Sequence, residues 1–249
     1  MNLGTGMGKA VAVVLASALA VFAADKKEKP KPAAAEMVDS GTFGVFIKGQ
    51  RVVNETFTIE QKNGGSVVKS QLKELSGGDS SGQKSELEMT ASGDLLRYDW
   101  SQGSGGSLTV LPNNDFLMEK VTAGSNKTAE KPFLMPSSSP ILDNNFFVQR
   151  EVLIWKYLAA DCKPEAGNMK CQSGPASFGV LVPQDQSSMS VKLELIGKEK
   201  ISFKGAEREL LRLNLSGENF DWALWVDDHN SFKLMRVSIP ADNTEVVRD

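Results

Sequence analysis

Apolar and polar residues alternate with a period of two along most of the chain after Ser40. Between residues 53 and 59, Val53, Phe57 and Ile59 occupy odd positions, whereas the even positions are polar. Successive side chains of an extended strand point to opposite faces, so this alternation predicts strands with one buried face. Asn63-Gly64-Gly65 then predicts a hairpin, because Asn and Gly tolerate the positive φ that tight turns require.

The same alternation returns in the C-terminal third, where residues 189–195 and 210–215 are apolar at every second position. Asp221–Asp227 differs, since Trp222 shares one face with apolar neighbours while Ala223 and Trp225 make the other face apolar too. A strand of this kind is covered on both sides. Together these segments predict a mainly β protein, with about ten or eleven antiparallel strands in meander order.

One segment has a helical pattern. Residues 141–160 (ILDNNFFVQREVLIWKYLAA) predict a helix with Asp143 as its N-cap and with residues 149–151 and Lys156 on a narrow polar side. Residues 124–140, rich in proline and serine, predict a loop before it. We expect one strongly curved antiparallel sheet, or an incomplete barrel, with this inserted helix covering its inner face. We prefer a single domain over residues 40–249, because neither half alone supplies both a sheet and its cover.

The N-terminus has the composition of a signal peptide. Lys9 precedes the uncharged segment 10–22 (AVAVVLASALAVF), and residues 21–23 resemble a cleavage site. This apolar segment is shorter than the roughly 20 residues of a membrane-spanning helix. We therefore expect residues 1–23 to be removed, leaving a periplasmic or secreted protein without a transmembrane segment; a buried N-terminal helix is the competing interpretation. Residues 24–39, rich in Lys, Pro and Ala, predict a disordered tether or tail.

The net charge argues against one class of partner, and the cysteine pair predicts a covalent link. The net charge is −3 at pH 7, which argues against a nucleic-acid partner, because phosphates require a basic face. Cys162 and Cys171 are the only cysteines, and in an exported chain such a pair predicts a disulfide. A redox or metal pair is the alternative, but redox pairs usually have CxxC spacing and a metal site needs more ligands.

The sequence offers little for catalysis. His229 is the only histidine, and its setting of Asp and Asn residues is typical of a polar turn, with a metal site or general base as the alternative. Asp94, Asp99 and Glu119 are scattered over predicted strands, and we expect them to face solvent. We therefore expect no enzyme, no cofactor and no bound metal.

Aromatic residues suggest a binding role instead. A sheet capped by an apolar helix can leave an elongated apolar cavity suited to an acyl chain. The alternative is that these residues fill a packed core. The candidate wall residues are Trp100, Phe116, Phe146, Phe147, Trp155, Trp222 and Trp225.

Three segments carry a resemblance to known proteins: residues 41–60 (GTFGVFIKGQRVVNETFTIE), residues 141–158 (ILDNNFFVQREVLIWKYL) and residues 223–240 (ALWVDDHNSFKLMRVSIP). In these the chain resembles a group of exported bacterial all-β proteins of unknown function. The order of strands with an inserted helix is also distantly similar to the half-barrel of the Lol-type lipoprotein carriers. That resemblance implies acyl-chain binding under a helical lid, although no functional residue of the carriers can be matched here.

The sequence thus leads us to expect an exported, non-catalytic protein that binds an apolar or lipid-like ligand in envelope assembly. The alternative is an interaction module with a fully packed core, which docks an envelope protein through an edge strand or a loop. A hydrolase is a third and weaker expectation.

Overall fold

The computed structural model describes residues 35–62, 64–76, 82–103, 105–123, 127–165 and 168–249. The predicted signal peptide, residues 1–23, and residues 24–34 of the predicted tether lie outside the described residues. For the last residues of the predicted tether, 36–39, the prediction was wrong. The first strand already begins at Glu36, and it includes Asp39, which is buried.

Fourteen antiparallel strands form one large curved sheet, which is not closed. The mainly β prediction with a single helix is confirmed, although the number of strands exceeds the ten or eleven expected. The first eight strands are β1 (Glu36–Ile47), β2 (Gln50–Lys62), β3 (Gly65–Glu74), β4 (Gln83–Thr90), β5 (Leu95–Gln102), β6 (Gly106–Asn113), β7 (Phe116–Ala123) and β8 (Thr128–Phe133). The other six are β11 (Ala176–Val182), β12 (Ser187–Phe203), β13 (Ala206–Ser216), β14 (Asp221–Asp227), β15 (Lys233–Ile239) and β16 (Thr244–Arg248).

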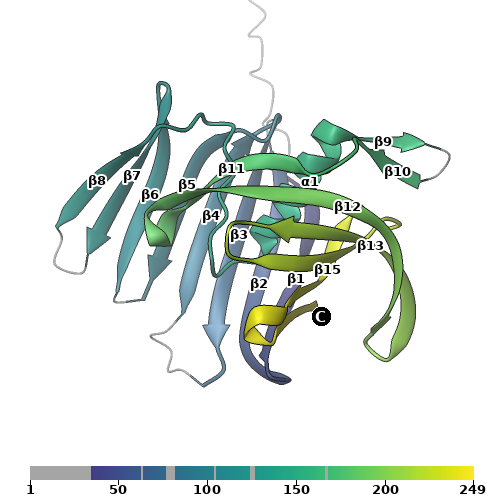
Figure 1. The fold of residues 1–249 in the computed structure, drawn as a ribbon. Coiled ribbons are helices and arrows are strands. Elements are labelled where there is room, and N and C mark those ends of the chain that lie inside the picture. Colours follow the sequence, from purple (N-terminus) through teal and green to yellow (C-terminus); the bar gives the residue numbers. More distant parts are fainter. Residues whose placement is uncertain (1–34, 63, 77–81, 104, 124–126, 166–167) are drawn as a thin grey trace, which may run out of the picture. The chain divides into compact units, whose positions relative to one another are not determined.

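The strands follow a meander that is interrupted once. Neighbours in sequence pair from β1 to β8 and from β11 to β16, and the last strand, β16, pairs with the first, β1 (Figure 1). The two edges of the sheet are therefore β8 and β11, on either side of the helical insertion. The expected loop over residues 124–140 was wrong in part, because β8 lies within it and pairs with β7.

The helix α1 (Val148–Asp161) begins later than the predicted Ile141. Before it, the chain extends beside the edge strand β11: the N–H of Leu142 donates to the carbonyl of Leu181, and the N–H of Leu181 to that of Pro140. These bonds occupy part of the free edge of β11. Asp143 consequently lies ahead of the helix and is not its N-cap, and Phe147 takes the N-cap position.

The apolar side chains form two clusters. The main cluster joins the helix to the inner face of the sheet and includes Phe43, Phe57 and Phe146. The smaller cluster consists of Ile201, Phe203, Leu210, Trp225 and Met235, contributed by β12 to β15. Trp225 belongs to the smaller cluster, whereas its near neighbour Trp222 packs against the main one. Strand β14 is thus apolar and covered on both faces, as its sequence predicts.

A short hairpin follows the helix and consists of β9 (Cys162–Glu165) and β10 (Asn168–Cys171). Cys162 and Cys171 lie opposite each other in its register and are joined as the predicted disulfide. Among the described residues, no helix has the length and apolarity needed to cross a bilayer.

Candidate functional site

The polar side of α1 faces the interior. Gln149 and Arg150 are 1% exposed and Glu151 is fully buried. The sequence places these three residues on a narrow polar side of the helix, and the structure turns that side towards the interior. Buried charges are expensive unless they are paired or hydrogen-bonded, so their partners determine how the helix sits on the sheet.

Glu55 of β2 caps the helix from across the interior. Its carboxylate accepts the N–H of Phe147 at 2.6 Å and that of Val148 at 3.2 Å. The hydroxyl of Ser70 donates to the same carboxylate at 2.8 Å. Glu55 thus satisfies N–H groups that the first turn of a helix leaves unpaired. Burial raises the pKa of Glu55 to about 7, despite these hydrogen bonds.

Arg150 holds the segment before the helix. Its guanidinium donates to the carbonyls of Asp143 and Phe146 and lies 5.3 Å from the ring centre of Trp222. Burial lowers the pKa of Arg150 to about 10. The hydroxyl of Tyr98 donates to the Asp143 carboxylate, so this segment is also bound to β5.

Glu151 connects the helix to β15 and β16 and, through Arg248, to β1. Its carboxylate accepts bonds of 3.0 Å from both the Arg248 guanidinium and the N–H of Leu234. Arg248 also pairs with Asp39 at 2.5 Å, and Lys233 lies 2.9 Å from the same carboxylate. Although burial acts to raise it, these hydrogen bonds hold the pKa of Asp39 below its ordinary value. These contacts form two buried networks, one around Arg150 and one around Glu151, and together they hold α1 on the sheet.

An apolar groove of about 410 Å³ runs along one side of the fixed helix. The helix contributes positions spaced three and four residues apart, which share one face. Strands β2 to β4 and the turn after β4 supply the opposite wall. We call this feature the α1 groove; its wall residues include Ile59, Ser66, Met89, Thr90, Val152, Trp155, Lys156, Ala159 and Ala160.

Hydrogen bonds hold two side chains in the wall of the α1 groove, and the space beside Gly93 is open. The indole N–H of Trp155 donates to the carbonyl of Phe232 at 3.1 Å, which orients the ring. The ammonium of Lys156 donates to the carbonyls of Gly93 at 3.1 Å and Ser138 at 2.6 Å, and its burial lowers the pKa. A side chain added at Gly93 would meet no atom within 4 Å, so the groove is open there.

The groove ends at a filled interior. An adjoining hollow, which shares Met89, Gly93, Val152 and Lys156 with it, encloses only about 20 Å³. That volume is about the size needed for one water molecule. A ligand of the size of an acyl chain would therefore lie along the flank of α1 rather than inside the sheet.

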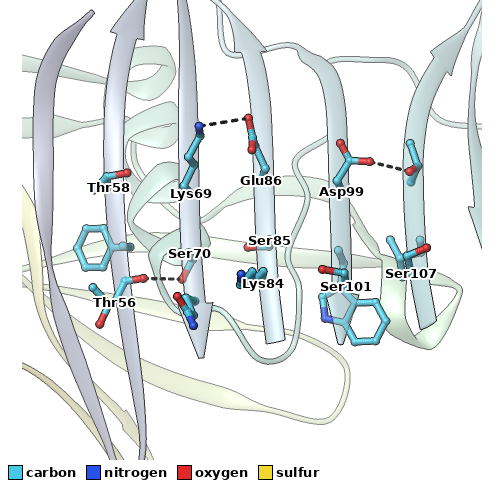
Figure 2. Close-up of a pocket in the computed structure, with 15 residues that line it drawn as sticks. Thr56, Thr58, Lys69, Ser70, Lys84, Ser85, Glu86, Asp99, Ser101 and Ser107 are labelled. Atoms are coloured by element: carbon cyan, nitrogen blue, oxygen red, sulfur yellow. Dashed lines mark hydrogen bonds and ion pairs between the residues drawn. The ribbon is translucent and has the colours of Figure 1, made fainter. Parts of the chain in front are cut away.

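A second hollow, of about 600 Å³, lies on the other face of strands β2 to β6, and most of the residues that line it are polar (Figure 2). The hollow is lined by the buried residues Phe57, Ser70, Ser85 and Leu108, by the candidate Trp100, and by the polar residues that alternate with them along the same strands. Its volume also lies in the range of ligand pockets.

The seven aromatic candidates separate into different environments. Phe146 and Phe147 are buried in the main cluster, and Trp222 and Trp100 pack against it. Phe116 is half-buried at the start of β7. Trp225 lies in the smaller cluster and takes no part in the surroundings of the helix. Trp155 is the candidate that lines the α1 groove, and the expectation that the others bound a ligand stays a prediction.

The alternation along two strands indicates buried glutamates, which the sequence interpretation missed. Glu55 shares its face of β2 with Val53 and Phe57, and Glu119 shares its face of β7 with Leu117. Both glutamates are fully buried, so the expectation that Glu119 faces solvent was wrong. The groove residues Ala159 and Ala160 were missed because small residues at a helix end look the same whether they border a groove or solvent.

The residues considered for catalysis lie on different elements of the fold, and the His229 imidazole lies 3.7 Å from the carboxylate of its neighbour Asp228. His229 is 79% exposed in the turn after β14, where its N–H donates to the carboxylate of Asp227 at 3.1 Å. Asp94 and Asp99 lie at the surface and form separate ion pairs. Within the ranges that the structure describes, no three His, Cys, Asp or Glu side chains gather closely enough to hold a metal ion.

Comparison with known proteins found no match to this chain among protein-family models, curated proteins or solved structures. The candidate site therefore rests on the geometry of the α1 groove.

Proposed function

We propose that this protein is an exported, non-catalytic binding protein that holds an apolar, lipid-like chain in the α1 groove during envelope assembly. The observation that carries the proposal is the groove itself, an open apolar channel of about 410 Å³ between a rigidly anchored helix and strands β2 to β4. Ligand pockets typically have volumes of about 300–1,000 Å³ and mainly apolar walls.

The composition of the wall supports an acyl-like ligand. Ile59, Met89 and Val152 supply aliphatic surface, and Trp155 supplies a flat ring held by a hydrogen bond. Burial of apolar surface contributes about 25 cal/mol per Å², so a flexible chain can bind without a specific polar contact. Hydroxyls of Ser66, Thr90 and Ser92 border the groove and can face a polar head group.

The packed interior favours a second candidate, an interaction module that docks an envelope protein. Such a module would need a free edge, and β8 is one of the two sheet edges. Its sequence contains Lys131 and Pro132, however, and both residue types hinder the addition of another strand. The α1 groove therefore carries the stronger proposal.

Titration with dansyl-undecanoic acid tests the lipid-like ligand. The dansyl emission of this fatty-acid probe shifts to the blue when the group leaves water. We expect saturable binding to the wild-type protein, and Ala159→Phe should weaken it by at least about tenfold by filling the groove. Ala159 is exposed, so the substitution leaves the core intact.

The matched control is Ala241→Phe, at an exposed alanine in the short helical turn Pro240–Asp242, away from the groove. This variant should bind the probe as the wild type does. A wild-type protein without saturable binding would overturn the proposal, and so would equal affinities for the Ala159→Phe and wild-type proteins.

A further inference from the structure

Two rows of polar side chains cross the hollow on the outer face of β2 to β6 (Figure 2). The pairing of the strands places one side chain of each strand directly beside its neighbour in the row. The first row is Thr56, Gln71, Lys84, Ser101 and Ser107. The second row is Thr58, Lys69, Glu86, Asp99 and Thr109.

Most polar side chains of the second row already have partners within the protein. Lys69 lies 3.7 Å from Glu86, and the hydroxyl of Thr109 donates to Asp99 at 2.6 Å. Arg97 forms a further ion pair with Asp99. These bonds leave the second row with few free donors and acceptors.

The first row differs, because none of its five side chains makes a hydrogen bond to another described residue. Thr56, Gln71, Lys84, Ser101 and Ser107 are all exposed. Hydroxyl and amide groups act as both donors and acceptors. Neighbouring strands lie about 4.8 Å apart, so the first row presents one polar group at each step across the sheet: hydroxyls or an amide on four strands and the donor-only ammonium of Lys84 on β4.

The charges in the hollow balance. Lys69 and Lys84 offset Glu86 and Asp99, and the remaining polar lining groups are uncharged. An anionic polymer would require a basic excess. A purely apolar ligand would leave the polar groups of most lining side chains without a partner. A strand-forming peptide binds at a sheet edge rather than on a face.

We propose that this hollow binds an extended neutral glycan, laid across β2 to β6 along the first row. A glycan offers hydroxyl groups on each sugar, and the sugar repeat of an extended chain is close to the spacing of strands. Successive sugars would thus meet successive side chains of the row. Each hydrogen bond to an exposed site contributes little, so the affinity should grow with the number of sugars.

Isothermal titration of the full chain with cellopentaose and chitopentaose tests the proposal, with cellobiose as the short comparison. We expect at least one pentasaccharide to bind with a dissociation constant of about 1 mM or tighter, and about tenfold more tightly than cellobiose. The double variant Gln71→Ala/Ser101→Ala should weaken this binding by about tenfold. Both residues are exposed, so the thermal unfolding temperature should remain unchanged.

The matched control is Ser188→Ala/Ser190→Ala, at exposed serines of β12 outside the hollow, which should bind as the wild type does. The proposal is overturned if neither pentasaccharide binds, or if both double variants bind with wild-type affinity. Tighter binding of polygalacturonate, an anionic chain, would also overturn it. None of these outcomes depends on the α1 groove.

Discussion

Replacing Glu119 by Gln should make the protein more stable at alkaline pH and leave it nearly unchanged at acidic pH. Glu119 lies on β7, is fully buried, and neither of its carboxylate oxygens has a hydrogen-bond partner among the described residues. Lys131, opposite it on β8, donates instead to the carbonyl of Gln186 at 2.7 Å. Burial raises the pKa of Glu119 from 4.5 to about 7, with Lys131 opposing the shift.

The size and sign of the effect follow from this pKa. Below pH 4.5 the folded and unfolded states are both protonated at Glu119, and its contribution to stability is fully present. As the pH rises towards 7, the unfolded state releases the proton first, so stability falls; above pH 7 the loss is complete. One pH unit corresponds to about 1.4 kcal/mol, so the loss between pH 5 and pH 8 should be about 2–3 kcal/mol.

Urea unfolding at pH 5, 6, 7 and 8, followed by tryptophan fluorescence, measures the effect. The free energy of unfolding of Glu119→Gln should exceed that of the wild type by about 2–3 kcal/mol at pH 8 and by much less at pH 5. Glu130→Gln is the control, because Glu130 is exposed on β8 and pairs with Lys120 at the surface. A difference between the wild type and Glu119→Gln that is the same at every pH would show that ionisation of Glu119 does not lower the stability.

Further substitutions test other contacts. Glu55→Ala should lower the free energy of unfolding by about 3 kcal/mol in the same urea assay, because buried N–H groups and Arg150 lose a partner; an unchanged value would contradict the capping role. Gly65→Ala should cost about 1–2 kcal/mol, since its Cβ would lie 2.6 Å from the Met89 carbonyl oxygen, whereas Gly179→Ala meets its nearest atom at 3.7 Å and should cost less. Cys162→Ser/Cys171→Ser should lower stability by about 2–3 kcal/mol, and two free thiols in the unreduced, denatured wild type would show that the disulfide is absent.

The sequence predicted the sheet better than the helix surroundings. Period-two alternation identified most strands, and the apolar residues on both faces of Asp221–Asp227 identified β14 as covered on both sides. Both predictions succeed because the geometry of a strand fixes which face each side chain points to. The boundaries around α1 were wrong, since Ile141 and Leu142 satisfy their backbone by extending beside β11. A local pattern does not reveal a partner that lies elsewhere in the fold.

The buried charges show the same limit. Arg150 and Glu151 look like solvent-facing residues of a helix until Asp143, Arg248 and the β15 backbone supply their partners. The α1 groove depends likewise on how the helix is set against β4, and this setting is fixed by the two buried networks. Strand parity alone could have placed Glu119 inside.

Native mass spectrometry of the purified full chain tests the central claim, that an apolar chain occupies the α1 groove. We expect a population of the wild-type protein to retain an additional mass, which fragmentation identifies as an acyl-bearing compound. That population should be absent from Ala159→Phe and present in Ala241→Phe. A wild-type protein that carries no such mass, and gains none after incubation with palmitic acid, would contradict the account.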